Sequence, residues 1–352
     1  MRLVAELETL VLRQEDVRRI FEIVGRDHVM TCLIERLSDG LGELGRGECP
    51  NSPPRAGFTR GAGARGVIDV MPHYLPGSGL TVKTISYNPN GRREANLPTV
   101  LGSIARIDEA SGAPIAICDA VLLTAVRTGA ASAIASRLFA LPKSRTVGVV
   151  GAGAQAVTQL HGLSLLFDID TVLVHDVSPV NAKSLKQRAS FIDCEFKTVS
   201  PHELLASSDI IFTATSVVPG AGPVIPDVEH LPHLHINSIG ADEVGKTELP
   251  VSMLRRAYVC VDHPEQARTE GESQQLEPEE IGLPLSYFCA HPEDASKHMN
   301  SLTVFDSTGF AWEDHIAMDV FLELARDIGL GEKVSIVHCP EDVHNPYDLS
   351  SW

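Results

Sequence analysis

The chain has 352 residues, of which 43% are hydrophobic and 21% are charged, and its formal net charge at pH 7 is −17. These values are typical of a globular protein with one large or two medium-sized domains. The acidic balance and the lack of long basic runs argue against nucleic acid and anionic membrane surfaces as partners. No apolar run approaches the roughly 18 residues of a membrane-spanning helix, and no secretory signal pattern opens the chain.

Cysteine and histidine spacing bears on compartment and metal binding. The seven cysteines are scattered and include no C-x-x-C pair, which predicts a reducing, cytoplasmic environment rather than a disulfide framework. His230, His233 and His235 have the spacing H-x-x-H-x-H, which is not a standard zinc pattern. The sequence therefore predicts no metal site.

The first 140 residues predict an α+β unit. Residues 7–12 read as a short strand, and two segments with helical spacing of apolar residues follow before position 45. The segment 45–66 is polar and rich in Gly, Pro and Arg, which predicts a loop. Short β-prone runs follow at 66–71, 80–85, 99–107 and 114–118, and their close spacing predicts a mostly antiparallel sheet. Residues 122–139 predict an Ala-rich helix whose small side chains imply close packing against another element.

A glycine-rich turn is the most informative motif of the chain. The β-prone run Thr146–Val150 leads directly into Gly151, Gly153 and Ala156, which form G-x-G-x-x-A before a helical pattern. The first glycine permits a tight turn, and the second lets the backbone approach a pyrophosphate at the helix N-terminus. The alternative is an ordinary strand–turn–helix with small residues. Asp176 ends the next strand, at the position where a dinucleotide site has a carboxylate that binds the ribose. An ordinary strand–turn–helix does not require an acid there.

From position 145 onward the pattern is one of strands alternating with helices. Strands are expected at 146–150, 171–175, 194–198, 209–214, 234–239, 257–261 and 303–305. This alternation predicts a Rossmann-type doubly wound parallel sheet. A helix at 312–328 and a polar tail are expected to return to the first unit. The predicted domains are therefore 1–140 with 313–352, and 141–312, of which the second carries the glycine-rich turn.

Three charged residues stand out by position. Lys83 interrupts an apolar strand and is either an outward-facing strand lysine or a ligand for a substrate carboxylate. Arg127 lies among small helical residues and is hard to bury without an anion such as a pyrophosphate. Asp242 follows the strand at 234–239, where ligands bind in parallel sheets, and is either a turn residue or a general acid/base.

Taken together, the motifs resemble the ornithine cyclodeaminase/mu-crystallin family. The resemblance covers nearly the whole chain from about Arg55 to Leu349, and its motifs are jointly specific for the family. The branch of ornithine cyclodeaminases is the most similar, because of Asp242 and the segment 268–276. The residues that carry the family resemblance are Asn96–Val100, Arg127–Ser132, Gly151–Gln155, Gly240–Leu249 and Phe305–Asp314.

The resemblance implies a set of site residues. Arg55 and Lys83 would hold the substrate carboxylate, and Asp242 would be the acid/base beside the substrate amines. Asp69 stands where ornithine cyclodeaminases carry Glu, which leaves room for a longer diamino acid such as lysine, and Thr308 replaces an apolar residue that faces the substrate. The residues implied in cofactor binding are Thr99, Arg127, Gly151, Gly153, Ala154, Gln155, Asp176, Thr215, Ile236, Asn237, Ser238, Ile239, Lys246 and Ser307.

The same resemblance implies a reaction in which NAD is recycled. NAD+ takes a hydride from Cα of ornithine or a related diamino acid, the side-chain amine attacks the resulting imine, and ammonia leaves. The hydride then returns to the cyclic imine and gives proline or its homologue. Asp176 favours NAD(H) over NADP(H), because its carboxylate repels a 2′-phosphate.

Two other functions stay open at this point. One is an oxidoreductase with net turnover of NAD(P)H, such as an amino-acid dehydrogenase, a cyclic imine reductase or an opine-like synthase. The other is a crystallin-like nucleotide-dependent binding protein, against which the presence of Asp242 argues. A homodimer is expected, from the family and from the shortness of the N-terminal strands. The resemblance implies substrate binding and dimerisation for the domain 1–140 with 313–352, and NAD binding for the domain 141–312.

Overall fold

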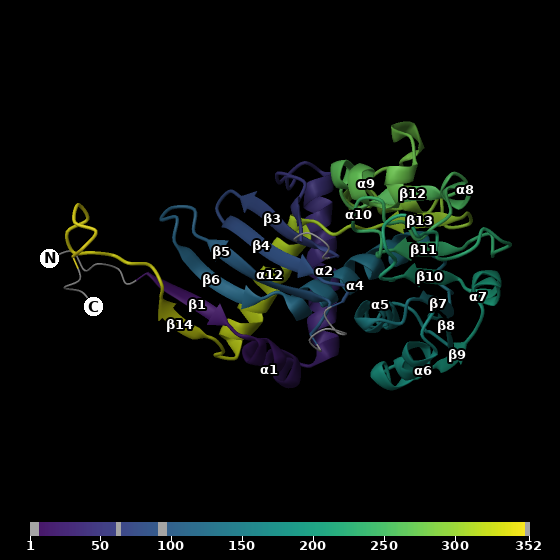
Figure 1. Ribbon diagram of the computed structural model, residues 1–352, viewed down its shortest axis with the longest axis horizontal. Coiled ribbons are helices and arrows are strands. Elements are labelled where there is room, and N and C mark those ends of the chain that lie inside the picture. Colours follow the sequence, from purple (N-terminus) through teal and green to yellow (C-terminus); the bar gives the residue numbers. More distant parts are fainter. Residues whose placement is uncertain (1–6, 61–64, 91–96, 349–352) are drawn as a thin grey trace.

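The computed structural model describes residues 7–60, 65–90 and 97–348, and its strands form two seven-stranded sheets (Figure 1). Helix α4 (Val121–Phe139) lies between the two sheets and contacts strands of both. Asn96 of the 96–100 motif, and residues 1–6 and 349–352 of the predicted first domain, lie outside the described residues.

The first sheet, here called the mixed sheet, has the strand order β14-β1-β6-β5-β4-β3-β2. Strands β1 and β6 pair in parallel, and every other pair of neighbouring strands in this sheet is antiparallel, as the sequence predicts for the N-terminal half. Its strands are β1 (Glu8–Leu12), β2 (Ala56–Thr59), β3 (Val67–Leu75), β4 (Gly79–Tyr87), β5 (Val100–Ile107), β6 (Pro114–Asp119) and β14 (Glu332–Ser335).

Alternation along β3 and β4 decides which side chains face the protein interior. Asp69 and Met71 of β3 are buried, as are Lys83 and Ile85 of β4, whereas the residues between them are more accessible. Since Asp69 pairs with Ile85 and Met71 pairs with Lys83, all four side chains lie on one face of the sheet. The strand Lys83 is therefore an inward-facing residue, and the outward-facing alternative is wrong.

Helices α1 (Gln14–Val24), α12 (Ala311–Asp327) and α4 contact strands of the mixed sheet on its inner face, and α2 (Arg26–Gly45) packs on these three helices. Their apolar side chains form the largest core cluster, which includes Ile20, Leu33, Ile134 and Phe321. The opposite face of the sheet stays open and carries apolar side chains. The exposed apolar residues on this outer face are Phe58, Ile68, Tyr74, Leu101 and Ile115.

The second sheet, here called the parallel sheet, has the order β12-β13-β11-β10-β7-β8-β9 with every neighbouring pair parallel. This is the predicted Rossmann-type sheet, and each predicted strand is present within two residues of its expected ends. Its strands are β7 (Thr146–Val150), β8 (Thr171–His175), β9 (Glu195–Thr198), β10 (Ile210–Thr213), β11 (His235–Ser238), β12 (Tyr258–Val261) and β13 (Thr303–Asp306).

Helices flank the parallel sheet, so its central strands are buried along their whole length. The longer ones are α5 (Ala154–Ser164) and α6 (Pro179–Arg188). The shorter ones are α7 (Pro201–Ser207), α8 (Val251–Leu254), α9 (Pro264–Glu270), α10 (Leu285–Ala290) and α11 (Pro292–Ala295), with 3₁₀ turns at Glu272–Gln275 and Pro278–Glu280.

The close packing predicted for the Ala-rich helix α4 is confirmed. A Cβ at Gly129 would lie 2.4 Å from the Thr158 carbonyl oxygen of α5, and a Cβ at Gly162 would lie 2.6 Å from the Gly129 carbonyl oxygen. Glycine at both positions lets the two helix backbones touch. This contact fixes α4, which carries Arg127, against the helix that begins at the glycine-rich turn.

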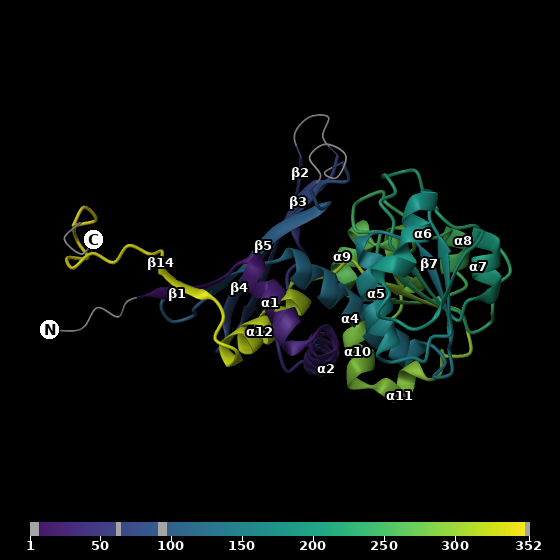
Figure 2. The same ribbon diagram turned by 90° about the horizontal axis from the view of Figure 1, so that it is seen from below.

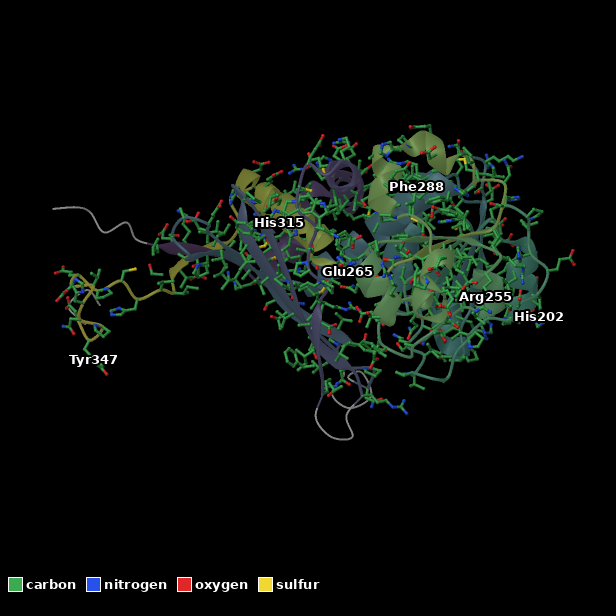
Figure 3. The ribbon with its side chains drawn as sticks, turned by 90° about the horizontal axis from the view of Figure 1, so that it is seen from above. His202, Arg255, Glu265, Phe288, His315 and Tyr347 are labelled. Carbon is green, nitrogen blue, oxygen red and sulfur yellow. The ribbon has the colours of Figure 1, made fainter. Side chains whose placement is uncertain are left out.

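The chain returns to the mixed sheet at its end, where β14 pairs antiparallel with β1 (Figure 2). The segment that follows projects away from the two sheets, and Tyr347 within it is 86% exposed (Figure 3). None of the helices in the described part of the chain combines the length and apolar character that crossing a bilayer requires.

Candidate functional site

The glycine-rich turn has the geometry that its sequence predicts. Gly151 has a φ of 91°, and its N–H donates to the carbonyl oxygen of His175 at 2.9 Å. A Cβ at this position would lie 2.6 Å from the Ala214 carbonyl oxygen, whereas a Cβ at Gly153 would meet no protein atom within 4 Å. Gly151 is therefore required by the turn itself, and Gly153 leaves open space where a ligand can approach the backbone.

A cavity of about 340 Å³ opens at the carboxyl ends of β7, β8 and β10. It brings together Gly151, Gly153, Asp176 and Thr215, four of the residues implied in cofactor binding. The position beyond the strand ends is where nucleotides bind in such sheets, and the N-terminus of α5 faces the same turn. The residues present therefore fit a dinucleotide. The remaining lining residues are Val150, His175, Val177, Asn181, Ala214, Ser216, Val217 and Val224.

Asp176 holds the turn as well as lining the cavity. Its Oδ2 accepts a hydrogen bond from the Ala152 N–H at 2.7 Å, and its Oδ1 accepts one from the Ser178 N–H at 2.7 Å. Arg188, which the sequence did not single out, donates to the carbonyl oxygens of Ala152 and Gly153 at 2.7 and 2.9 Å. The turn is thus held by two charged side chains, one that accepts from its N–H group and one that donates to its carbonyl oxygens.

Several other residues implied in cofactor binding lie elsewhere. Ala154 is the exposed first residue of α5, and the carbonyl oxygen of Thr99 accepts a hydrogen bond from Asn88. Three consecutive side chains of β11 point into the interior instead of into a cavity. Ile236 packs in a core cluster, Asn237 donates to Ser136 Oγ and Ser238 donates to Glu272. Any contact of these three with a cofactor would have to use their backbone.

A second, smaller cavity of about 90 Å³ collects all five residues implied in catalysis and substrate binding. Arg55, Asp69, Lys83, Asp242 and Thr308 come from five different segments: the loop before β2, β3, β4, and the loops after β11 and β13. The cavity also contains four residues from the cofactor set, namely Arg127, Gln155, Ile239 and Ser307. The other lining residues are Val67, Met71, Ile85, Tyr87, Val100, Thr124, Thr128 and Gly309.

A buried charge network lies at the wall of this cavity. The Lys83 Nζ is 2.6 Å from Asp314 Oδ2, and both side chains are fully buried. Arg127 contacts the same carboxylate through Nε at 3.1 Å and contacts Glu313 through Nη1 at 3.0 Å. Burial lowers the pKa of Lys83 to about 8, although Asp314 acts in the opposite direction. Burial likewise raises the pKa of Glu313 to about 8, against the effect of Arg127.

Arg55 ties the two sheets together across the cavity. Its Nη2 donates to the Asp242 carbonyl oxygen at 2.7 Å, and its Nη1 donates to the Thr308 carbonyl oxygen at 3.2 Å. Its Nε lies 2.7 Å from Glu270 Oε1 and 3.8 Å from Asp69 Oδ2. Burial raises the pKa of Asp69, although Arg55 acts in the opposite direction. Each nitrogen of the guanidinium therefore has an oxygen of the protein beside it.

The carboxylate of Asp242 is paired with Lys246, whose Nζ donates to Oδ1 at 2.7 Å. Although burial opposes the charged form, Asp242 raises the pKa of Lys246. The same ammonium lies 4.8 Å from the ring centroid of Tyr87. Asp242 is partly accessible and Lys246 is buried, so the lysine holds the carboxylate from the protein side.

Thr308 is buried, and its hydroxyl already has protein partners. It donates to Asp262 Oδ1 at 3.1 Å and accepts from Gln266 Nε2 at 2.7 Å. Its neighbour Ser307 donates to the same aspartate at 3.3 Å. The hydroxyl of Thr308 therefore meets a substrate only as an acceptor, because its hydrogen is used within the protein.

The three histidines around β11 are not brought together. His233 contacts Asp209, His235 contacts Thr303, and His230 contacts a backbone carbonyl. In residues 7–60, 65–90 and 97–348, no group of three or more His, Cys, Asp and Glu side chains has a geometry that could hold a metal ion.

Three acids that contact the site cations were not identified from sequence. Asp314 and Glu313 belong to the motif Phe305–Asp314, and Glu270 belongs to the segment 268–276, so the sequence marks these acids only as parts of family motifs. The available indication was the presence of cations in apolar surroundings, since a buried Lys83 or Arg127 requires an anionic partner. Which acid supplies it depends on the tertiary fold.

Comparisons with known proteins agree with this geometry. The model of the ornithine cyclodeaminase/mu-crystallin family matches residues 13–328. An L-lysine cyclodeaminase of Streptomyces rapamycinicus is 48% identical over 343 residues, which cover 97% of this chain and 100% of that protein.

Two solved structures are similar over nearly the whole chain. The structure of a lysine cyclodeaminase, solved to explain its recognition of L-lysine, L-ornithine and L-2,4-diamino butyric acid, has a TM-score of 0.95 at 50% identity and covers 97% of this chain and 99% of that one. An archaeal alanine dehydrogenase dimer with bound NAD has a TM-score of 0.84 at 29% identity and covers 94% of this chain and 100% of that one.

Proposed function

Since the chain belongs to the ornithine cyclodeaminase/mu-crystallin family, we propose that it is an NAD-dependent cyclodeaminase that acts on an L-diamino acid, with L-lysine as the favoured substrate. The observation that carries the proposal is the second cavity. It places two cations, Arg55 and Lys83, with two carboxylates, Asp69 and Asp242, next to the helix that starts at the glycine-rich turn.

NAD fits the first cavity, and a relative of the same fold is an NAD-bound alanine dehydrogenase. The turn at Gly151 and Gly153 would receive the pyrophosphate, and Asp176 would receive the adenosine ribose and disfavour a 2′-phosphate. When bound, NAD supplies a reversible hydride acceptor for Cα of the substrate. Arg127, Gln155 and Ser307 line the second cavity and would face the nicotinamide side.

The substrate carboxylate would be held by Lys83 and Arg55. Both side chains line the cavity, and both are shielded from water, so their attraction for an anion is weakly screened. Asp314, which does not line the cavity, holds the Lys83 ammonium in place from the protein interior. This arrangement fixes the one permanent anion of an amino acid and thereby orients Cα.

Asp242 would be the acid/base. Its carboxylate is partly accessible at the cavity and is oriented by Lys246. It would take the proton from the side-chain amine, whose nitrogen then bonds to Cα. The bond from Cα to the α-amino nitrogen breaks, and the same proton leaves on ammonia. No net oxidation occurs, so the products are ammonia and a cyclic amino acid whose ring nitrogen is a secondary amine.

Two observations favour lysine over ornithine. The similarity to an L-lysine cyclodeaminase extends over 97% of this chain and 100% of that protein. In addition, Asp69 lies at the wall of the cavity, and its side chain is one methylene shorter than the Glu found in ornithine cyclodeaminases. The extra space suits a substrate with one more methylene.

The test is a turnover assay with catalytic amounts of NAD+. The purified protein is incubated with L-lysine, L-ornithine or L-2,4-diaminobutyrate, and ammonia and the cyclic product are quantified by chromatography. We expect ammonia and pipecolate in equal amounts from lysine, with no accumulation of NADH. Turnover that needs stoichiometric cofactor would refute the cyclodeaminase proposal.

A need for stoichiometric cofactor would favour the second candidate, an amino-acid dehydrogenase or imine reductase with net cofactor turnover. The similarity to an alanine dehydrogenase supports this candidate, because the same fold serves both chemistries. Incubation with pyruvate, ammonia and NADH distinguishes the two, since a dehydrogenase consumes NADH there. A crystallin-like binding protein would turn over none of these substrates.

The proposal includes a homodimer of two-domain subunits. The outer face of the mixed sheet exposes Phe58, Ile68, Tyr74 and other apolar side chains, and a second copy of the chain would cover them. We propose the domain limits 1–140 with 313–352 and 141–312, and a cytoplasmic location. The seven thiols, all unpaired within the chain, are compatible with that location.

A further inference from the structure

One buried carboxylate is hydrogen-bonded to the chain segments of both cavities. Glu248 lies in the loop between β11 and α8, and its side chain has no exposed surface. Its Oε1 accepts from the Thr215 N–H at 2.6 Å, and its Oε2 accepts from the Gly240 N–H at 2.9 Å. The hydroxyl of Thr213 also donates to Oε2, at 2.6 Å. The carboxylate therefore holds the carboxyl ends of two neighbouring strands, β10 and β11 (Figure 1).

The two N–H groups that Glu248 binds belong to segments with different roles. Thr215 lines the first cavity, whose residues fit a dinucleotide. Gly240 is two residues before Asp242, which lines the second cavity. One side chain thus holds the strand end that reaches the first cavity and the strand end that leads to the second.

The contact with Gly240 also closes the loop that carries the proposed acid/base. Gly240 and Glu248 are the two ends of this loop, and Asp242 and Lys246, whose side chains are paired at 2.7 Å, lie between them. A Cβ at position 240 would collide with the Glu248 carboxylate, so the close approach requires glycine. Because its ends are held together, the loop keeps Asp242 in a fixed place relative to β11.

The backbone of Glu248 is anchored independently of its side chain. Its N–H donates to Glu272 Oε1 at 2.7 Å, and its carbonyl oxygen accepts from the Val224 N–H at 2.8 Å. The side chain therefore extends from a fixed point and can hold the two strand ends. A carboxylate suits this place because it accepts at both oxygens, whereas an amide would turn its NH₂ group toward one of the two N–H groups.

We propose that Glu248 is a positioning residue that couples the cofactor cavity to the acid/base loop, because it holds the backbone at Thr215 and at Gly240 at the same time. The inference rests on the proposed function for the roles of Thr215 and Asp242. It adds that cofactor affinity and proton transfer both depend on one buried side chain that lines neither cavity.

The experiment removes both acceptors with Glu248→Met, a side chain of similar length, in the full-length protein. Fluorescence titration gives the dissociation constant of NADH, and ammonia release from L-lysine at saturating NAD+ gives kcat, counted per NADH-binding site. We expect the dissociation constant to rise about tenfold and kcat to fall about tenfold, since each strand end loses a hydrogen bond to a charged group. The KM for L-lysine should not change, because Arg55 and Lys83 hold the substrate carboxylate in the proposed function.

Asp209 offers the matched control. Its Oδ2 accepts from the N–H groups of Arg145 and Thr146, at 2.9 and 3.0 Å, at the amino end of β7. It therefore holds backbone N–H groups at the edge of the parallel sheet opposite to the cavities. Asp209→Leu should lower the melting temperature and leave both the NADH dissociation constant and kcat per site at the parent values.

Parent values of both parameters in Glu248→Met, however unstable the variant, would overturn the inference, because Glu248 would then only stabilise the fold. A change in one parameter alone would overturn it too, because both cavities must respond. If the Met variant does not fold, Glu248→Gln is measured in the same way. Its amide can serve only one of the two N–H groups, so a loss in at least one parameter supports the inference, and parent values of both refute it.

The parent protein alone tests the proposed function. If it releases no ammonia from diamino acids but consumes NADH with pyruvate and ammonia, the proposed function fails, and the same two parameters are measured on that reaction. The comparison of variant with parent then decides the inference as before. A parent with neither activity would overturn both, because the inference requires proton transfer in the second cavity.

Discussion

The ammonium of Lys83 lies 2.6 Å from Oδ2 of Asp314, and neither side chain is accessible to solvent. Removal of one partner from a buried ion pair leaves an uncompensated charge in a medium of low polarity. We expect Asp314→Asn to lower the free energy of unfolding by about 3–5 kcal/mol, measured by urea denaturation. The double variant Lys83→Met, Asp314→Leu should recover only part of this loss, since it removes both charges of the pair but leaves Arg127 Nε without the carboxylate that it contacts at 3.1 Å. A single variant as stable as the parent would contradict the prediction.

The acid/base role proposed for Asp242 predicts the behaviour of Asp242→Asn. The amide cannot carry the proton, so ammonia release from L-lysine should fall by about a hundredfold or more. NAD binding, measured by fluorescence titration, should be unchanged because Asp242 does not line the first cavity. The neighbouring acid Glu243 gives the matched control, and Glu243→Gln should retain activity. Parent-like turnover of the Asn variant would show that another group transfers the proton.

The two glycines of the turn should differ in what they affect. Gly151→Ala forces a φ of 91° on alanine and places a Cβ 2.6 Å from the Ala214 carbonyl oxygen, so it should lower both thermal stability and NAD affinity. Gly153→Ala meets no protein atom within 4 Å. The Gly153→Ala variant should have the melting temperature of the parent but a lower affinity for NAD, because its methyl group enters the space that the pyrophosphate needs. Unchanged NAD affinity in Gly153→Ala would place the cofactor elsewhere.

Glu313 should make stability depend on pH. Burial raises its pKa from 4.5 to about 8, so the folded protein holds this proton more tightly than the unfolded chain. Its contribution is fully present below the unfolded pKa and is lost as the pH rises through about 8. The free energy of unfolding should therefore decrease as the pH rises from 4.5 to about 8. Glu313→Gln keeps an acceptor for Arg127 and should make this decrease with pH less steep. Glu272 and Asp306, with pKa values raised by burial to about 8 and about 7, act in the same direction, so the slope should not vanish.

The open face of the mixed sheet predicts where subunits meet. Ile115→Asp places a charge on that outer face, and sedimentation should show a shift from dimer to monomer. Ile23 on α1 is similarly exposed but lies outside the mixed sheet, and Ile23→Asp should leave the dimer intact. A parent chain that sediments only as a monomer would refute the dimer.

Much of the fold could be predicted because its elements have strong local patterns. The strands of the parallel sheet are short apolar runs bounded by turns, and each appears within two residues of its expected ends. The two missed strands, β2 and β14, lie at the edges of the mixed sheet. Every residue of β2 is exposed and β14 is largely polar, so neither shows the alternation that identifies a strand, and the expected loop at 45–66 is wrong over β2.

The site was predictable in its cations and much less so in its acids. Lys83 and Arg127 attract notice because charge in an apolar context is costly. Asp314, Glu313 and Glu270 lie in polar-looking sequence, and only the packing of α12 and α9 against the strands makes them partners of those cations. The interior orientation of Asn237 and Ser238 likewise follows from the close approach of α4 and the 3₁₀ turn, which local sequence does not encode.

The return of the chain to β1 through β14 has a consequence for biosynthesis. Strands β7 to β13 occupy Thr146–Asp306 without interruption, so all the pairing partners of the parallel sheet have left the ribosome once Asp306 has emerged. The mixed sheet begins with β1 and must wait for α12 and then for Glu332–Ser335. Domains generally fold as units during synthesis. A nascent chain that has reached only Asp306 therefore carries every strand of its nucleotide-binding sheet, while the face with Lys83 still lacks the helix that supplies Asp314.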